Sequence, residues 1–198
     1  MAKIAYYGGW WFQDTALFSN PARLAKTISN MDEELGRSDE EFIKAFKSKY
    51  TNHFTPSWIM LEITTFGTMS ILYSNLNSGR CKRQIAKYFG VADTVMVSWL
   101  HAMTYIRNVC AHHSRLWNRT LGISPIMPRR TANPFISLPP KGTRHVYFIL
   151  AIIQYWLNIL NPSNTFKTKI MALLSKYPAI DISAMGFPAN WEKEAFWL

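Results

Sequence analysis

The feature that most constrains the fold is an uninterrupted stretch from Val91 to Leu121 that contains neither glycine nor proline. Such a stretch permits one helix of roughly eight turns. At 100° per residue, a helix over residues 94–119 gathers one apolar stripe on a single face. The stripe contains Trp99, Met103, Ile106, Cys110, His113 and Trp117. The sequence therefore predicts a long helix with one buried face.

The opposite face of this predicted helix is polar, with His101, Thr104, Asn108, His112, Arg115 and Arg119. His112 lies beside Asn108 and Arg115 at helical spacing, whereas Arg107 lies about 140° away from His112. An exposed imidazole can act as a general acid or base, and the alternative is an ordinary surface histidine. His113 and Trp117 are predicted to pack in the core, with base stacking as the alternative role of Trp117.

The rest of the chain is predicted to be helical as well, and no segment shows the alternation typical of a strand. Helices are expected from a Ser38-x-x-Glu41 capping pattern to Tyr50, from Ser57 to Leu76, from Arg80 to Phe89, from Arg144 to Leu160, and from Ser163 to about Lys176. Five prolines and two glycines in residues 122–142 predict a long loop that is basic at Arg129, Arg130 and Lys141. The predicted fold class is all-α.

Positive charge is concentrated in one part of the chain. The formal net charge is +10, and residues 80–130 hold nine Lys and Arg against Asp93 alone, which is a local net charge of +8. Residues 1–79 hold seven basic against eight acidic side chains. A local basic field indicates a polyanionic partner, most simply nucleic acid, and the alternative is a solvated surface.

Several classes of protein are disfavoured by what the sequence lacks. Cys81 and Cys110 lie far apart and outside any CxxC pattern, which fits a cytoplasmic protein without disulfides. The apolar run of residues 146–160 is short for a membrane span and contains Gln154 and Asn158, so no membrane association is expected. Phosphate-binding glycine loops and HExxH are absent, and adjacent histidines on a helix cannot both face one metal. We expect neither cofactor nor metal.

One segment carries a family resemblance. The hexapeptide R-N-V-C-A-H at residues 107–112 resembles the R-x4-6-H motif of the HEPN superfamily. The longer string RNVCAHHSRLWNR at 107–119 resembles the signature of the AbiD/AbiF abortive-infection proteins. Three further segments resemble that family in the same order: PSWIMLEITTFGTMSILY at 56–73, IAKYFG at 85–90 and MGFPANWEKEAFW at 185–197. The resemblance covers about residues 6–197. Because YYGGWWF at 6–12 resembles the end of a first HEPN helix, earlier turns are expected upstream.

The resemblance implies a single HEPN-like helical domain over residues 1–198 that dimerises, so that two motifs form one cleft. Many HEPN proteins are metal-independent endoribonucleases, and this family is linked to phage defence by abortive infection. By position, Arg107 and His112 match the ends of the motif and Asn108 its polar position, so these three are the expected catalytic residues. The expected RNA-binding residues are Arg115, Arg119, Arg129 and Arg130.

The corresponding mechanism is attack of an RNA 2′-hydroxyl on the adjacent phosphodiester. His112, or its counterpart in a dimer, transfers the proton, Arg107 stabilises charge on the phosphoryl oxygens, and Asn108 orients His112 or the phosphate. Two other hypotheses stay open. One is a non-catalytic RNA-binding module that uses the same basic face. The other is a restrained HEPN partner subunit whose cleft is blocked by a regulatory RNA or an antitoxin.

Overall fold

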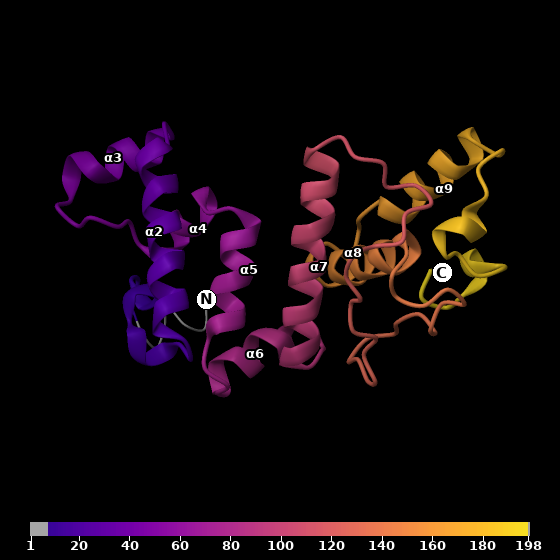
Figure 1. Ribbon diagram of the computed structural model, residues 1–198, viewed down its shortest axis with the longest axis horizontal. Coiled ribbons are helices and arrows are strands. Elements are labelled where there is room, and N and C mark those ends of the chain that lie inside the picture. Colours follow the sequence, from indigo (N-terminus) through magenta and orange to yellow (C-terminus); the bar gives the residue numbers. More distant parts are fainter. Residues whose placement is uncertain (1–7, 198) are drawn as a thin grey trace. The chain divides into compact units, whose positions relative to one another are not determined.

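The computed structural model describes residues 8–197, and its regular structure is helical throughout that range (Figure 1). Eight α-helices and four short 3-10 helices occur, with one isolated β-bridge between Phe18 and Leu76 and no strand among the described residues. The all-α prediction is confirmed, while the HEPN-like arrangement and the single domain stay predictions. The chain divides into two compact units, Met1–Ile85 and Ala86–Leu198.

The first unit contains four helices, of which α2 is the longest. They are α2 (Pro21–Arg37), α3 (Glu41–Lys49), α4 (Ser57–Ile63) and α5 (Phe66–Asn75). The side chain of Asn20 accepts a hydrogen bond from the N–H of Arg23, and Pro21 occupies the first turn. Both features favour a helix start at this point. α2 then packs its apolar face against α4 and α5.

A buried asparagine ties the start of α2 to the end of α5. Asn75 donates from Nδ2 to the carbonyl oxygen of Asn20 at 2.9 Å and accepts from the N–H of Asn20 at 3.0 Å. Lys82 is also buried, and its Nζ donates to the carbonyls of Ser74 and Leu76 at 2.8 and 3.0 Å. These bonds satisfy polar groups that α5 leaves open at its end.

Two details of this unit differ from the sequence prediction. The expected helix over residues 57–76 is broken, because Thr65 caps α5 by accepting from the N–H of Thr68. The carboxylate of Glu34, on α2, accepts from the Thr65 N–H and the Thr68 hydroxyl and so holds the break in place. The capping pattern at Ser38 also fails, since Ser38 ends α2 and Glu40 precedes α3.

The segment at residues 6–12 does not end an α-helix where the structure describes it. Residues 6 and 7 lie outside the described range. From Gly8 the chain turns and enters a 3-10 helix at Trp11–Gln13. Phe12 is buried edge-to-face against Phe54, so this segment is held by aromatic packing.

The second unit is built on α7 (Asp93–Ala111) and α8 (Val146–Leu160), with α9 (Phe166–Lys176) packed on α8. α6 (Arg80–Tyr88) leads into it and stops before Gly90, which has φ +65°. That helix agrees with the prediction, and a glycine with positive φ is typical of a helix C-terminus. α8 is mostly buried, and nowhere in residues 8–197 is there a helix with the length and apolarity needed to cross a bilayer.

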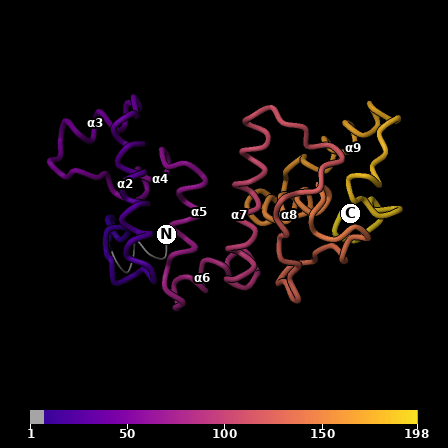
Figure 2. Tube along the Cα trace, in the orientation of Figure 1, coloured from indigo at the N-terminus to yellow at the C-terminus, as the bar shows by residue number. Residues whose placement is uncertain are grey.

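The predicted loop over residues 122–142 is confirmed, and it runs back along α7 (Figure 2). Ile126 bonds α7 twice: its N–H donates to Ser98 Oγ at 3.0 Å and its carbonyl accepts from Trp99 Nε1 at 2.9 Å. Further on, the N–H of Ala132 donates to the carbonyl of Gly90 at 2.8 Å. The loop is therefore fastened at several points by α7 and the turn before it.

An aromatic core holds both the loop and the C-terminal tail. Trp99 is fully buried, and Phe135 of the loop packs edge-to-face on Tyr155 and Phe196. Three aromatic side chains of the tail are buried: Trp191, Phe196 and Trp197. Trp197 Nε1 donates to the Tyr147 hydroxyl at 3.0 Å, and burial raises the pKa of Tyr147.

Two glycines give opposite expectations for added side chains. At Gly90 a Cβ would lie 2.7 Å from both Ala132 Cβ and Tyr155 Oη, whereas at Gly36, within α2, it would meet nothing within 4 Å. We expect Gly90→Ala to lower the free energy of unfolding by about 2 kcal/mol, because the cost of a left-handed backbone at alanine and the cost of the steric overlap are additive. Gly36→Ala should raise it by up to about 1 kcal/mol. Chemical denaturation measures both, and a Gly90→Ala protein as stable as wild type would contradict the packing.

His145 gives a pH-dependent expectation. Burial, then the charges of Lys141 and Arg144, lower its pKa below 6.5, and its Nδ1 has no hydrogen-bond partner among the described residues. As the pH falls through 6.5, His145 binds a proton in the unfolded chain but stays neutral in the folded chain. Acidification therefore favours unfolding. Between pH 7 and pH 5, His145→Asn should lose less unfolding free energy than wild type, whereas exposed His101→Asn should follow wild type. If wild type, His145→Asn and His101→Asn all lose the same unfolding free energy over this pH range, His145 is not the cause of the pH dependence.

Candidate functional site

The helix that carries the R-N-x3-H motif ends at Ala111, within the motif region. His113 adopts a left-handed conformation with φ +50°, and its N–H donates to the Cys110 carbonyl. The N–H of Ser114 donates to the Val109 carbonyl at 3.0 Å. This pair of bonds is a Schellman motif, which closes a helix C-terminus. The predicted continuation to residue 119 is therefore wrong.

The apolar stripe drawn through residues 94–119 is correct only in part. Trp99 and Ile106 are buried as predicted. Cys110 and His113 are exposed, and Trp117 has 40% of its surface exposed, so none of them packs in the core. His113 and Trp117 fail because they lie beyond the helix, where helical spacing no longer sets direction.

The three residues expected to be catalytic all lie exposed near the end of α7. Arg107 donates from Nη1 to Asn108 Oδ1 at 3.3 Å. The backbone N–H of His112 donates to the Asn108 carbonyl at 3.0 Å, and His112 is the C-cap residue of α7. Within the described part of one chain, no hydrogen bond joins Arg107 to His112. One copy thus joins the side chains of Arg107 and Asn108 by a hydrogen bond, and the described residues show no such bond between Arg107 and His112.

Tyr105 belongs to the same region and was missed by the sequence analysis. Its hydroxyl accepts from the N–H of Gly122 at 3.3 Å, and that bond, with the charge of nearby Arg119, lowers the pKa of Tyr105. Arg119 also donates from Nη1 to the Arg115 carbonyl at 3.4 Å. The signal that could have found Tyr105 is its spacing of seven residues from His112, which places both about 20° apart on one helix face.

The segment from His112 to Gly122, here called the strap, is held at both ends. It begins at the Schellman motif and contains a second left-handed residue, Asn118, with φ +49°. Near its end Leu121 is fully buried and donates from its N–H to the Arg144 carbonyl at 2.9 Å, while Arg144 Nε donates back to the Leu121 carbonyl. The strap is therefore an ordered surface segment that projects Arg115 and Trp117.

The central sequence of the second unit is rich in cations and lacks acidic residues. The chain contains no Asp or Glu between Asp93 and Asp181. The ion pairs among the described residues, Lys44–Glu41 and His53–Asp32, both lie in the first unit. Arg115 on the strap and Arg129 and Arg130 on the 122–142 loop are exposed. The result is a positive field that attracts polyanions.

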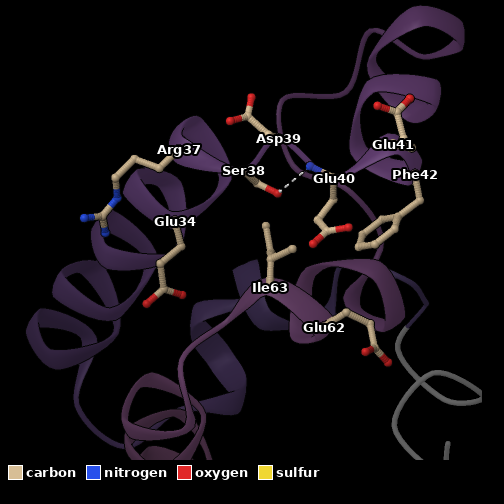
Figure 3. Close-up of a pocket in the computed structure, with 9 residues that line it drawn as sticks. All are labelled: Glu34, Arg37, Ser38, Asp39, Glu40, Glu41, Phe42, Glu62 and Ile63. Carbon is tan, nitrogen blue, oxygen red and sulfur yellow. Dashed lines mark hydrogen bonds between the residues drawn. The ribbon is translucent and has the colours of Figure 1, made fainter. Parts of the chain in front are cut away.

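One groove in the first unit is mainly acidic, with Arg37 as the one basic residue of its lining, although residues 1–85 as a whole hold ten Lys and Arg against eight Asp and Glu. A groove of about 760 Å³ is lined by the carboxylates of Glu34, Asp39, Glu40, Glu41 and Glu62. Figure 3 shows these carboxylates pointing in different directions, and the residues of 8–197 include no group of three or more His, Cys, Asp or Glu placed to hold a metal ion. Such a groove repels phosphates, so we place the candidate site at the end of α7.

The left-handed residue gives a test of where α7 ends. His113→Gly should raise the free energy of unfolding by roughly 0.5–1 kcal/mol, because glycine adopts this conformation without the steric cost of a side chain. In a continuing helix the same change would lower it by about 1 kcal/mol. Ala111→Gly, inside the last turn, is the control and should destabilise. Denaturant unfolding reports both signs, and a destabilised His113→Gly would contradict the helix end.

Comparison with protein families gives one match, and it includes the motif. Residues 1–118 match the family model described as Abi-like protein, which is more than half of the chain. Comparison with curated proteins and with solved structures gives no match. The matched residues include Arg107, Asn108, His112 and the first part of the strap. The chain therefore belongs to the Abi-like family of abortive-infection proteins.

Proposed function

We propose that this protein is a HEPN-type endoribonuclease that cleaves RNA without a metal ion in abortive-infection phage defence. The observation that carries the proposal is the exposed R-N-x3-H sequence at the end of α7, within a stretch of the chain, residues 94–180, that contains no Asp or Glu. Family membership supports the defence role. The basic surface supports RNA as the substrate.

In the proposed reaction the RNA supplies its own nucleophile. A 2′-hydroxyl attacks the neighbouring phosphorus, its proton passes to an imidazole, and the 5′-oxygen leaves with a proton from a second acid. The products are a 2′,3′-cyclic phosphate and a free 5′-hydroxyl. His112 transfers a proton, and Arg107 stabilises negative charge on the phosphoryl oxygens. Asn108, already bonded to Arg107, orients that guanidinium.

A complete site needs two copies of the chain. The reaction needs one group to accept a proton and another to donate one, and each chain offers one His112 at this place. Arg107 and His112 also leave α7 in different directions, about 140° apart. A two-fold partner that presents its own motif would place two histidines and two arginines around one phosphate. We therefore propose a homodimer.

RNA backbone binding is assigned to the strap and the 122–142 loop. Arg115 and Arg119 lie on the strap, and Arg129 and Arg130 lie on the loop, which is fastened to α7 through Ile126. Arginine contacts to phosphates release counterions, so binding should weaken steeply as salt rises. These contacts position RNA and do not select its sequence.

One observation favours a second candidate function. Within a single chain Arg107 bonds Asn108 and does not meet His112. A chain that does not form the shared cleft would still bind RNA through its basic surface, as a non-catalytic module. A regulatory RNA or an antitoxin seated on that surface would give a restrained partner subunit. These alternatives predict RNA affinity, or occupancy by a partner, without cleavage.

The test is an RNA cleavage assay in excess EDTA with wild type, His112→Ala and His101→Ala. His101 is an exposed histidine on α7 outside the motif and serves as the matched control. We expect wild type and His101→Ala to leave 2′,3′-cyclic phosphate ends, and His112→Ala to be slower by roughly 10²–10⁴-fold. Equal cleavage by His112→Ala would remove His112 from the mechanism. RNA binding without cleavage by wild type would favour the second candidate.

A further inference from the structure

We propose that Trp117 is a base-stacking residue and that the RNA taken by this site is single-stranded. This inference rests on the proposed function and adds the class of substrate. Helical spacing had placed Trp117 in the core, whereas the structure leaves 40% of its surface exposed on the strap. The ring is therefore available to a partner.

The surroundings of Trp117 select a polyanion as that partner. Arg115 precedes it and Arg119 follows it, each two residues away on the strap. No acidic residue lies nearer in sequence than Asp93 or Asp181. An aromatic ring between two cations suits a nucleic-acid strand, whose base stacks on the ring while its phosphates lie against the guanidinium groups. An acidic or purely apolar protein partner would use only half of this arrangement.

The strap also holds the ring in advance of binding. His113 and Asn118 fix left-handed turns on either side of Trp117. Both ends of the strap are fastened to the fold. The Schellman bond at Ser114 holds the first end, and the buried Leu121 and the bond from Gly122 to Tyr105 hold the second. An ordered backbone leaves less freedom to be lost when a ligand binds, which raises affinity. The strap is thus built to present an aromatic ring.

Stacking on an exposed ring requires an unpaired base. In double-stranded RNA the bases stack on each other inside the helix, and its major groove is too narrow for side chains to reach them. Single strands, loops and bulges offer free base faces, and an aromatic side chain accepts any of the four bases. The inferred substrate is therefore unpaired RNA with little sequence preference at the stacked position.

A second exposed tryptophan supplies a matched control. Trp58 lies on α4 in the first unit with 51% of its surface exposed. No Lys or Arg lies between Lys49 and Arg80 in the sequence, so Trp58 lacks the flanking cations of Trp117. Replacing either ring removes an exposed indole from the surface, and only the loss of Trp117 should affect RNA.

The experiment measures the affinity of fluorescein-labelled oligoadenylate and of a blunt RNA duplex of equal length by fluorescence anisotropy. All proteins carry His112→Ala, so that the RNA stays intact. We expect Trp117→Ala to weaken single-strand binding about tenfold, Trp117→Phe to keep most of it, and Trp58→Ala to leave it unchanged. Duplex binding should be weaker and equal in all variants.

Each other outcome has a defined meaning. Equal single-strand affinity in Trp117→Ala overturns the stacking role and leaves the proposed ribonuclease standing. Equal weakening on single strand and duplex overturns the choice of unpaired RNA. If the His112→Ala protein binds no RNA and the wild-type protein cleaves none, both the proposed function and this inference are overturned. If Trp117→Ala fails to fold by circular dichroism, photocrosslinking of 4-thiouridine RNA to the Trp117→Phe and wild-type proteins replaces it: a crosslink at position 117 is expected, and crosslinks elsewhere alone overturn the role.

Discussion

The hydrogen bonds that close α7 determine the character of the candidate site. They place His113 in a left-handed turn and release the chain from helical geometry after Ala111. Had the helix continued, Trp117 would face the core and the arginines after it would lie along one helical face. Because it stops, the same residues form a fastened surface strap beside His112. The RNA chemistry proposed for this site therefore depends on the left-handed backbone conformation of His113.

The aromatic core of the second unit fixes the position of the loop over residues 122–142. Trp99 both fills the core and donates to the Ile126 carbonyl, so one side chain joins packing to loop placement. Phe135 repeats the pattern by entering the cluster of Tyr155 and Phe196. A proline-rich segment without helix or strand is thereby ordered from within. Arg129 and Arg130 of this loop remain exposed to solvent.

Helices, loop limits and motif residues were predictable because their signals are local. Gly90 marks the end of α6, and the prolines after Leu121 mark the loop. The end of α7 was not predictable, since a histidine occupies the position where glycine usually signals a Schellman turn. The break before α5 depends on Glu34 from another helix. Tyr105 joins this region through the hydrogen bond from Gly122, which forms only once the strap has folded, and the shared cleft proposed above would need a second chain.

The missing carboxylates between Asp93 and Asp181 also bear on the stability of the second unit. Residues 86–198 hold twelve Lys and Arg against four Asp and Glu, so the excess cations repel one another, and folding brings them closer together than they are in the unfolded chain. The folded unit therefore stores self-repulsion that dissolved counterions only screen. A bound polyanion removes it directly, and ligand binding and folding become thermodynamically linked. A nucleic acid bound as proposed would neutralise part of the positive charge of the folded unit and so stabilise it.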